Sequence, residues 1–197
     1  MTDQGAPSAR HGHLAVWTGA EMLVFGGETS AGVTATGAAY NPTTDTWRAL
    51  APMPGRRCSA IAEQVAGKIY VIGGATLMDG SGEAALFGDR PQRILGTNQM
   101  YDPATNTWTA KSPMSTSRNH AFSGVVNGKI YVIGGRVGAA HVTASSNTDI
   151  VEEYDPARDT WGALRARMPT PRSGGGWGTY NGRIYVAGGE GQHERAN

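Results

Sequence analysis

One spacing recurs four times along this chain of 197 residues: an arginine, fifteen further residues, and then a pair of glycines. The copies start at Arg10, Arg57, Arg118 and Arg172 and end at Gly26-Gly27, Gly73-Gly74, Gly134-Gly135 and Gly188-Gly189. None of them has an insertion or a deletion between the arginine and the glycines. Repeats at intervals of about 20–50 residues are typical of solenoids, propellers and arrays, so the spacing predicts one continuous array of similar units.

The third copy shows how the first half of a unit is built. The segments 121–126 and 130–133 have the composition of strands and flank Asn127-Gly128, which is typical of a two-residue hairpin turn because both turn residues take a positive φ. The equivalent turns are Ala66-Gly67, Asn181-Gly182 and the weaker Gly19-Ala20-Glu21. The second strand of each hairpin is apolar without alternation, which indicates a strand that is covered on both faces.

Three copies continue with a second block, in which a tryptophan follows a tyrosine by seven positions. The blocks run from Tyr40 to Trp47, from Tyr101 to Trp108 and from Tyr154 to Trp161, each with Asn-Pro or Asp-Pro after the tyrosine. This dipeptide favours a turn, so the two aromatic residues are expected on a third and a fourth strand. Four-stranded meanders with two apolar faces must stack face to face, and stacking around an axis gives a β-propeller.

The glycine pair, the Tyr-Asp-Pro turn, the spaced tryptophan and the arginine before the first strand together resemble kelch repeats, from about Arg10 to Gly189. The first copy departs slightly, with Asn41 in place of aspartate before the proline. The resemblance implies an all-β, kelch-type β-propeller with blades at 10–50, 57–111 and 118–164 and a half blade at 172–197. Kelch propellers include protein-binding modules, carbohydrate oxidases and sugar mutarotases, so the resemblance implies no single activity.

The fourth copy lacks the second block, and residues 1–9 resemble a connector between blades rather than missing strands. Because kelch propellers usually close with five to seven blades, we expect an incomplete propeller that forms an open fan. Such a fan exposes apolar blade faces and an unpaired strand edge. We therefore expect a fragment of a longer protein, or a chain that self-associates through its open blade faces.

Nearly all variation in length falls in one connection of the repeat. Between the glycine pair and the tyrosine there are 12, 26 and 18 residues in successive copies, whereas tryptophan and the next arginine are 10, 10 and 11 positions apart. In a meander both connections lie on the same rim, and variable loops on a rigid scaffold usually carry binding. In the longest loop, 75–100, Arg90 and Arg93 are candidate contacts. Leu86-Phe87 would either anchor a partner or hold this loop against the blades.

The four repeated arginines invite comparison with an anion clamp, but one residue at one offset in every blade favours a structural role. The next position differs in each copy: His11, Cys58, Asn119 and Ser173. In kelch propellers that bind peptides, this position and the loops between the second and third strands line the mouth. The remaining candidates are His120 and three residues that directly follow glycine pairs, Glu28, Arg136 and Glu190.

Composition excludes several other classes of function. A net charge of +1 gives no general attraction to nucleic acid or to an anionic membrane. The single cysteine, Cys58, excludes an internal disulfide and a cysteine zinc cluster, and an inert thiol is expected rather than a nucleophile paired with His11 or His120. His11, His13 and His120 lack a carboxylate or thiolate at ligand spacing, so we expect neither a metal nor a cofactor.

No stretch approaches 18 apolar residues, and residues 1–7 lack the basic start and the apolar segment of a signal peptide. We expect a soluble protein, and the sequence does not indicate its compartment.

Two functions from different classes remain open. The first is a binding module without catalysis, whose mouth and rim loops hold a protein segment or a glycan. The alternative is a carbohydrate-active enzyme resembling the sialic-acid mutarotases, which would use arginine, histidine and glutamate at the mouth for acid–base chemistry. The lack of a convergent acid–base pair in the sequence favours the binding module.

Overall fold

The computed structural model describes residues 1–77, 92–137 and 147–191, and these residues form an all-β fold. The first sheet consists of β1 (Leu14–Trp17), β2 (Met22–Phe25), β5 (Gly37–Asn41) and β6 (Thr46–Leu50). The second consists of β7 (Ile61–Val65), β8 (Lys68–Ile72), β11 (Asn98–Asp102) and β12 (Thr107–Lys111). The third consists of β13 (Phe122–Val126), β14 (Lys129–Ile133), β15 (Val151–Asp155) and β16 (Thr160–Trp161). The fourth has only β17 (Gly176–Tyr180) and β18 (Arg183–Ala187).

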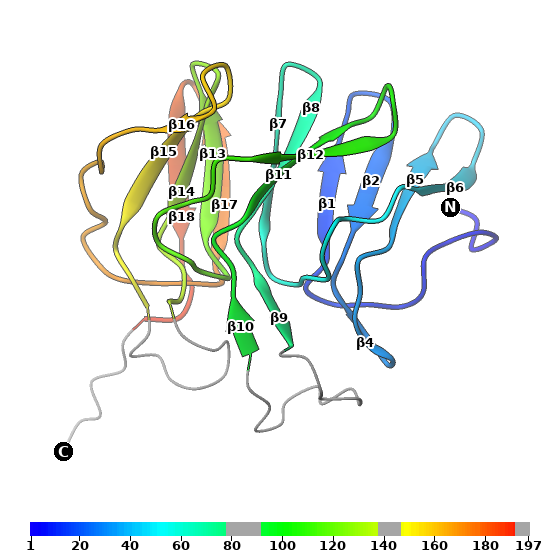
Figure 1. The fold of residues 1–197 in the computed structure, drawn as a ribbon, viewed down its shortest axis with the longest axis horizontal. Coiled ribbons are helices and arrows are strands. Elements are labelled where there is room, and N and C mark those ends of the chain that lie inside the picture. Colours follow the sequence, from blue (N-terminus) through cyan, green and yellow to red (C-terminus); the bar gives the residue numbers. More distant parts are fainter. Residues whose placement is uncertain (78–91, 138–146, 192–197) are drawn as a thin grey trace.

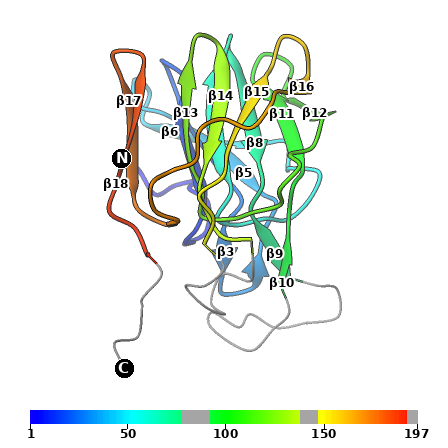
Figure 2. The same ribbon diagram turned by 90° about the vertical axis from the view of Figure 1, so that its left-hand side faces the viewer.

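All of these sheets are antiparallel, and they are arranged as successive blades (Figures 1 and 2). The first strands β1, β7, β13 and β17 lie next to one another in that order. Two small hairpins, β3 (Glu28–Thr29) with β4 (Gly32–Val33) and β9 (Ala75–Leu77) with β10 (Gln92–Ile94), belong to connections between second and third strands. The described strands close no ring, so the fold is an incomplete β-propeller, as the sequence predicts.

The glycine pairs are required by a close approach between neighbouring blades. Gly26 has a φ of 62°, and a Cβ atom there would lie 2.5 Å from the carbonyl oxygen of Arg57 in the next blade. The N–H of Gly27 donates to the same oxygen at 2.9 Å. A larger residue at Gly26 would separate the two blades, whereas a Cβ atom at Gly27 would lie 2.8 Å from the carbonyl oxygen of His11 in its own blade.

Aromatic side chains fill the interfaces between blades. The ring of Phe25 on β2 lies 5.1 Å from the rings of both Tyr101 and Trp108 in the second sheet. In the next interface the ring of Tyr70 on β8 lies 5.9 Å from that of Tyr154 on β15. Removal of these rings from water stabilises the stack by about 25 cal/mol per Å² of buried apolar area.

The same aromatic residues also form a polar clamp that the spacing alone does not reveal. The Tyr101 hydroxyl donates to Asn106 Oδ1 at 2.7 Å, and that oxygen also accepts from the N–H of Ala51 at 2.8 Å. The indole N–H of Trp108 donates to the carbonyl oxygen of Ala51 at 3.0 Å. This Tyr–Asx–Trp clamp therefore binds both the N–H and the C=O group of Ala51, which lies in the segment that follows the last strand of the previous blade.

Each of the three four-stranded sheets makes one such clamp. In the third sheet the Tyr154 hydroxyl donates to Asp159 Oδ1 at 2.6 Å, that oxygen accepts from the N–H of Ser112 at 2.8 Å, and the Trp161 indole donates to the Ser112 carbonyl at 2.8 Å. In the first sheet the Tyr40 hydroxyl donates to Asp45 Oδ1 at 2.6 Å, that oxygen accepts from the N–H of Thr2 at 2.8 Å, and the Trp47 indole donates to the Thr2 carbonyl at 3.0 Å. Thr2 thus occupies, for the first blade, the position that Ala51 and Ser112 occupy for the next two. This agrees with the prediction that residues 1–9 resemble a connector between blades.

The repeated arginines have the structural contacts that their uniform offset suggests. Each donates to the carbonyl oxygen of the first glycine in its own pair: Arg10 to Gly26 at 3.0 Å, Arg57 to Gly73 at 3.2 Å, Arg118 to Gly134 at 3.3 Å and Arg172 to Gly188 at 3.0 Å. Two of these arginines are almost fully buried and reach the third strand of their blade: Arg57 donates to Gln99 Oε1 at 2.7 Å and Arg118 to Glu152 Oε2.

The fourth sheet differs from the other three in exposure. Trp177 on β17 packs against Phe122 of the third sheet, with the ring centres 6.0 Å apart. On the opposite side, Tyr185 of β18 is 53% exposed. The expectation that every second strand is covered on both faces is therefore wrong for β18, because no described residue packs against its outer face.

We predict that Trp108→Ala lowers the free energy of unfolding by about 3–5 kcal/mol, because it leaves a cavity and breaks the bond to Ala51. Arg93→Ala, at an exposed position on β10, should change it by less than about 0.5 kcal/mol. Urea unfolding followed by circular dichroism measures both values. A larger loss for Arg93→Ala would contradict this division between scaffold and rim.

Arg57 and Arg172 occupy the same repeat position, so they form a matched pair for a second test. Arg57→Ala should cost about 2 kcal/mol or more, because it strands the Gln99 amide and the Gly73 carbonyl in a buried site. Arg172→Ala should cost less than half as much, since the side chain of Arg172 is half-buried and has only the Gly188 carbonyl as a partner among the described residues. Equal losses in chemical unfolding would show that the third-strand contact of Arg57 contributes nothing.

A third test concerns the buried carboxylate of Glu153. Lys129 Nζ lies 2.7 Å from Glu153 Oε1, and this contact, with further hydrogen bonds from Tyr131 and Arg165, lowers the pKa of Glu153 from 4.5 to about 2. A depressed carboxylate pKa stabilises the fold above the unfolded value near 4.5, and this contribution disappears as the pH falls from there towards 2. Glu153→Gln should therefore be less stable than the wild type at pH 7, and the difference should shrink between pH 5 and pH 3. Urea midpoints across this range measure it; a difference that does not depend on pH would contradict the assignment.

Candidate functional site

The variable connections of the repeat gather at one end of the sheets. The β3–β4 and β9–β10 hairpins project from this end, and the tight turns between first and second strands lie at the other (Figure 1). The chain also crosses from blade to blade at this end (Figure 1). We call it the mouth, and it is the rim on which the sequence places the candidate residues.

The residue after each arginine pairs with the residue after each glycine pair. The isolated antiparallel bridges are His11 with Glu28, Cys58 with Ala75, Asn119 with Arg136, and Ser173 with Glu190. Seven of the ten candidates are thus brought together as cross-strand neighbours. These bridges continue the register of each hairpin, in which the start of the first strand lies opposite the end of the second. In the third sheet, for example, Phe122 pairs with Ile133.

One position further along, a ladder of backbone hydrogen bonds joins the blades. The N–H of Ser59 donates to the carbonyl of Gly12 at 2.8 Å, that of His120 to Ser59 at 2.9 Å, and that of Gly174 to His120 at 3.0 Å. All four residues have a positive φ, between 48° and 64°. For Ser59 and His120 this is an uncommon conformation, so the ladder fixes the mouth at a cost in backbone strain. Glycine at two of the four equivalent positions, Gly12 and Gly174, is the feature of the sequence that could have indicated this positive-φ position.

A buried polar cluster lies at the mouth between the third and fourth blades. Arg136 donates from Nε to Ser173 Oγ at 3.0 Å and from Nη2 to Glu190 Oε2. The Arg136 side chain is 9% exposed and that of Glu190 is 61% exposed, so a buried cation is paired with a carboxylate that faces water. Asn147 donates from Nδ2 to the carbonyl of Glu190 at 2.7 Å, and its buried Oδ1 has no hydrogen-bond partner among the described residues.

Asn147 was absent from the sequence-based candidates because it lies in a connection without a repeated position. Only its bridge to Arg136, which also pairs with Asn119, places it in the site.

His120 lies beside this cluster. Burial, reinforced by the nearby charge of Arg136, lowers the pKa of His120 below its ordinary value of 6.5. Its Nδ1 lies 2.6 Å from Asn119 Oδ1, so the tautomer that donates this hydrogen bond leaves Nε2 as an acceptor.

The first two blades contribute a second group of candidates. His11 Nε2 lies 3.5 Å from Glu28 Oε2, and the other oxygen, Glu28 Oε1, is buried without a hydrogen-bond partner among the described residues. The thiol of Cys58 lies 3.6 Å from the carbonyl of Ala75, and burial raises its pKa to about 11. A protonated, buried thiol matches the inert interpretation of Cys58 rather than a nucleophile.

The remaining candidates are not brought into either group. Arg93 is exposed on β10, where it pairs with Thr76, and Arg90 lies outside the described residues. In the described part of the chain, no three His, Cys, Asp or Glu side chains come together as a metal site would require. Nor does any helix within residues 1–77, 92–137 and 147–191 have the length and apolar character to cross a membrane.

Comparison with known proteins places this geometry in a family. The model of the Attractin/LZTR1 β-propeller family matches residues 1–197. Kelch repeat and BTB domain-containing protein 12 of Homo sapiens is 32% identical over 158 residues, which are 76% of this chain and 24% of that protein. Kelch-like protein terF of Aspergillus terreus is 30% identical over 198 residues, 96% of this chain and 41% of that protein. The chain thus spans well under half the length of these relatives.

A solved structure described as "Structure of YjhT" superimposes with a TM-score of 0.74 at 18% identity, over 91% of this chain and 58% of that one. At this identity the likeness concerns the fold alone. The repeat spacing, the blades and the family match agree, and this chain belongs to the kelch-repeat β-propellers.

Proposed function

We propose that the chain is a binding module whose mouth holds a protein segment. The observation that carries the proposal is the Arg136 cluster, in which Ser173 and Glu190 accept from a cation that is largely withdrawn from water and Asn147 holds the Glu190 carbonyl. Fixed donors and acceptors of this kind recognise the polar backbone and side chains of a peptide. The similarity to kelch-like proteins also supports a protein-interaction module.

The first two blades supply a complementary half of the proposed site. His11 offers an exposed imidazole that pairs with the buried carboxylate of Glu28. Together with the Arg136 cluster it gives the mouth both cationic and anionic groups. We therefore expect a ligand of mixed polarity, such as a peptide with both donor and acceptor side chains, rather than a polyanion.

We expect a peptide library panned on the immobilised chain to yield ligands that bind at the mouth. Arg136→Gln should weaken their binding by at least about tenfold, because it removes a buried charged donor. Arg183→Gln is the matched control, since Arg183 is exposed beside the Asn181-Gly182 turn at the opposite end of β18, and it should leave binding unchanged. Circular dichroism verifies that both variants fold.

A glycan array probed with the same proteins tests the other ligand class. Glycan binding that depends on Arg136, without any peptide ligand, would contradict the protein-segment proposal. A sugar that the wild-type chain converts to another anomer would support the carbohydrate-active alternative.

We further propose that these blades work within a larger assembly. Gly188 keeps the positive φ of its counterparts, 66°, although no described atom lies within 4 Å of the position where its Cβ would be. In the other three copies that position faces the arginine carbonyl of the next repeat, as Gly26 faces Arg57. The exposed side chains of Tyr180 and Tyr185 support the same proposal, with further blades or a second copy of the chain covering the fourth sheet.

A further inference from the structure

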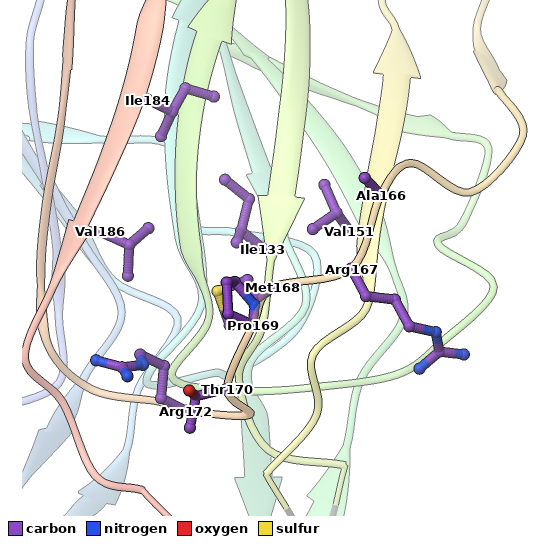
Figure 3. A pocket seen from close by; sticks show the side chains of 10 residues that line it. All are labelled: Ile133, Val151, Ala166, Arg167, Met168, Pro169, Thr170, Arg172, Ile184 and Val186. Atoms are coloured by element: carbon purple, nitrogen blue, oxygen red, sulfur yellow. The ribbon is translucent and has the colours of Figure 1, made fainter.

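A cavity of about 410 Å³ lies between the third and fourth sheets. Figure 3 shows Ile184 and Val186 of β18 on one side and Ile133 and Val151 of the third sheet on the other, with Met168 near the centre. These apolar side chains resemble those that pack against a neighbouring blade elsewhere in this fold.

The corresponding spaces in the other two interfaces are filled by aromatic side chains. Ile133 directly precedes its glycine pair, as Phe25 does in the first blade. Phe25 contacts the rings of Tyr101 and Trp108, which come from the third and fourth strands of the next sheet. In the fourth sheet no described residue corresponds to these two strands, so the cavity occupies the position of a tyrosine and a tryptophan.

The edge of β18 beside this cavity is also unpaired. The equivalent strands β2, β8 and β14 each pair with a first strand and with a third strand, whereas β18 pairs only with β17 in the described chain. In the complete blades Ile69 pairs with Tyr101 and Ile130 with Tyr154. The equivalent residue is Ile184, so a strand added to β18 in the same register would place its tyrosine opposite Ile184.

The polar groups of a clamp are present as well. Ala51, Ser112 and Ala166 each stand two residues before a methionine at the start of the next repeat. The first two are held by Tyr–Asx–Trp clamps, whereas the N–H and C=O groups of Ala166 have no hydrogen-bond partner among the described residues.

Arg172 also lacks a contact that its counterparts make in the described chain. Its counterparts Arg57 and Arg118 donate to Gln99 and Glu152, each two residues before the tyrosine of its block. Among the described residues, the side chain of Arg172 donates only to the carbonyl of Gly188. A side chain with an acceptor, two residues before an incoming tyrosine, would complete this site.

We propose that the β18 edge, the cavity, Ala166 and Arg172 together form a docking site for a β-hairpin with the pattern Glx-x-Tyr-x4-Asx-x-Trp. The tyrosine and tryptophan fill the cavity, the Asx side chain accepts from the N–H of Ala166, and the indole donates to its carbonyl. The Glx side chain accepts from Arg172. Backbone pairing with β18 supplies affinity, and the side-chain pattern supplies specificity.

The hairpin comes from polypeptide outside residues 1–197. The three blocks of this chain that carry the Tyr-x4-Asx-x-Trp part of the pattern are engaged with Thr2, Ala51 and Ser112. Residues 78–91, 138–146 and 192–197 contain neither tyrosine nor tryptophan. A second copy has the same three blocks in use, so it could offer a hairpin only by dismantling one of its own blades.

A peptide copied from this chain provides the probe. Residues 98–112 contain Gln99, Tyr101, Asn106 and Trp108 in the proposed pattern. Closure of its ends by a disulfide between added terminal cysteines holds it as a hairpin and reduces the entropy lost on binding. Fluorescence anisotropy of the labelled peptide with the full chain should show saturable binding. A peptide with Tyr101→Ala and Trp108→Ala should bind at least about tenfold more weakly.

Two substitutions on β18 form a matched pair. Val186→Arg places a charge in the apolar cavity and should weaken binding by about tenfold or more. Tyr185→Arg adds the same charge to the opposite, exposed face of the same strand and should change binding by less than about threefold. If Val186→Arg fails to fold, hydrogen exchange on the wild-type chain replaces it: the peptide should slow exchange of the β18 amides.

Three results would overturn the proposal. The first is the absence of saturable binding, and the second is equal binding of the two peptides. The third is a dimer of the chain alone, measured by sedimentation, that Val186→Arg dissociates and the peptide does not, because a second copy would then cover this site.

Discussion

The Tyr–Asx–Trp clamp is the interaction on which the arrangement of the blades depends. Trp108 both packs against Phe25 and donates to the carbonyl of Ala51, so one residue fills the interface and fixes the connecting chain. A sheet with two apolar faces is stable only when both are covered, and the clamp aligns the next sheet for that purpose. The glycine pair then allows the backbones to approach closely enough for Gly27 to donate to Arg57.

Because the clamp repeats in each of the three four-stranded sheets, the positions between these contacts are free to differ. The ladder through Ser59 and His120 fixes the backbone beside the candidate residues, whatever their side chains are. The uniform frame therefore carries dissimilar groups, such as a buried thiol at Cys58 and a buried amide at Asn119, at equivalent places. This separation of constant backbone from variable side chains is what a specific binding surface requires.

Local and periodic features of this fold could be predicted from sequence. The hairpin at Asn127-Gly128 has positive φ at both residues, 51° and 73°, as the dipeptide indicates, and the fixed offset of Arg118 identified its structural role. The clamp could not be predicted, because the bond from Trp108 to Ala51 joins residues 57 positions apart and leaves no sign in the spacing. Asn147 was missed for a related reason: a single residue in a variable connection has no equivalent in the other repeats.

We expect the two proposed binding surfaces to be coupled through the end of β18. Glu190 lies three residues beyond Ala187, the last residue of that strand, and supplies the carboxylate that pairs with Arg136. One edge of β18 is unpaired within the described chain, so the backbone that holds this carboxylate is restrained by β17, by the bridge to Ser173 and by the hydrogen bond from Asn147 Nδ2 to the Glu190 carbonyl. A hairpin that pairs with β18 would restrict the same backbone and hold Glu190 in place before a ligand arrives. Since the entropy lost on ordering opposes binding, completion of the fourth sheet should strengthen binding at the mouth without any contact to the ligand.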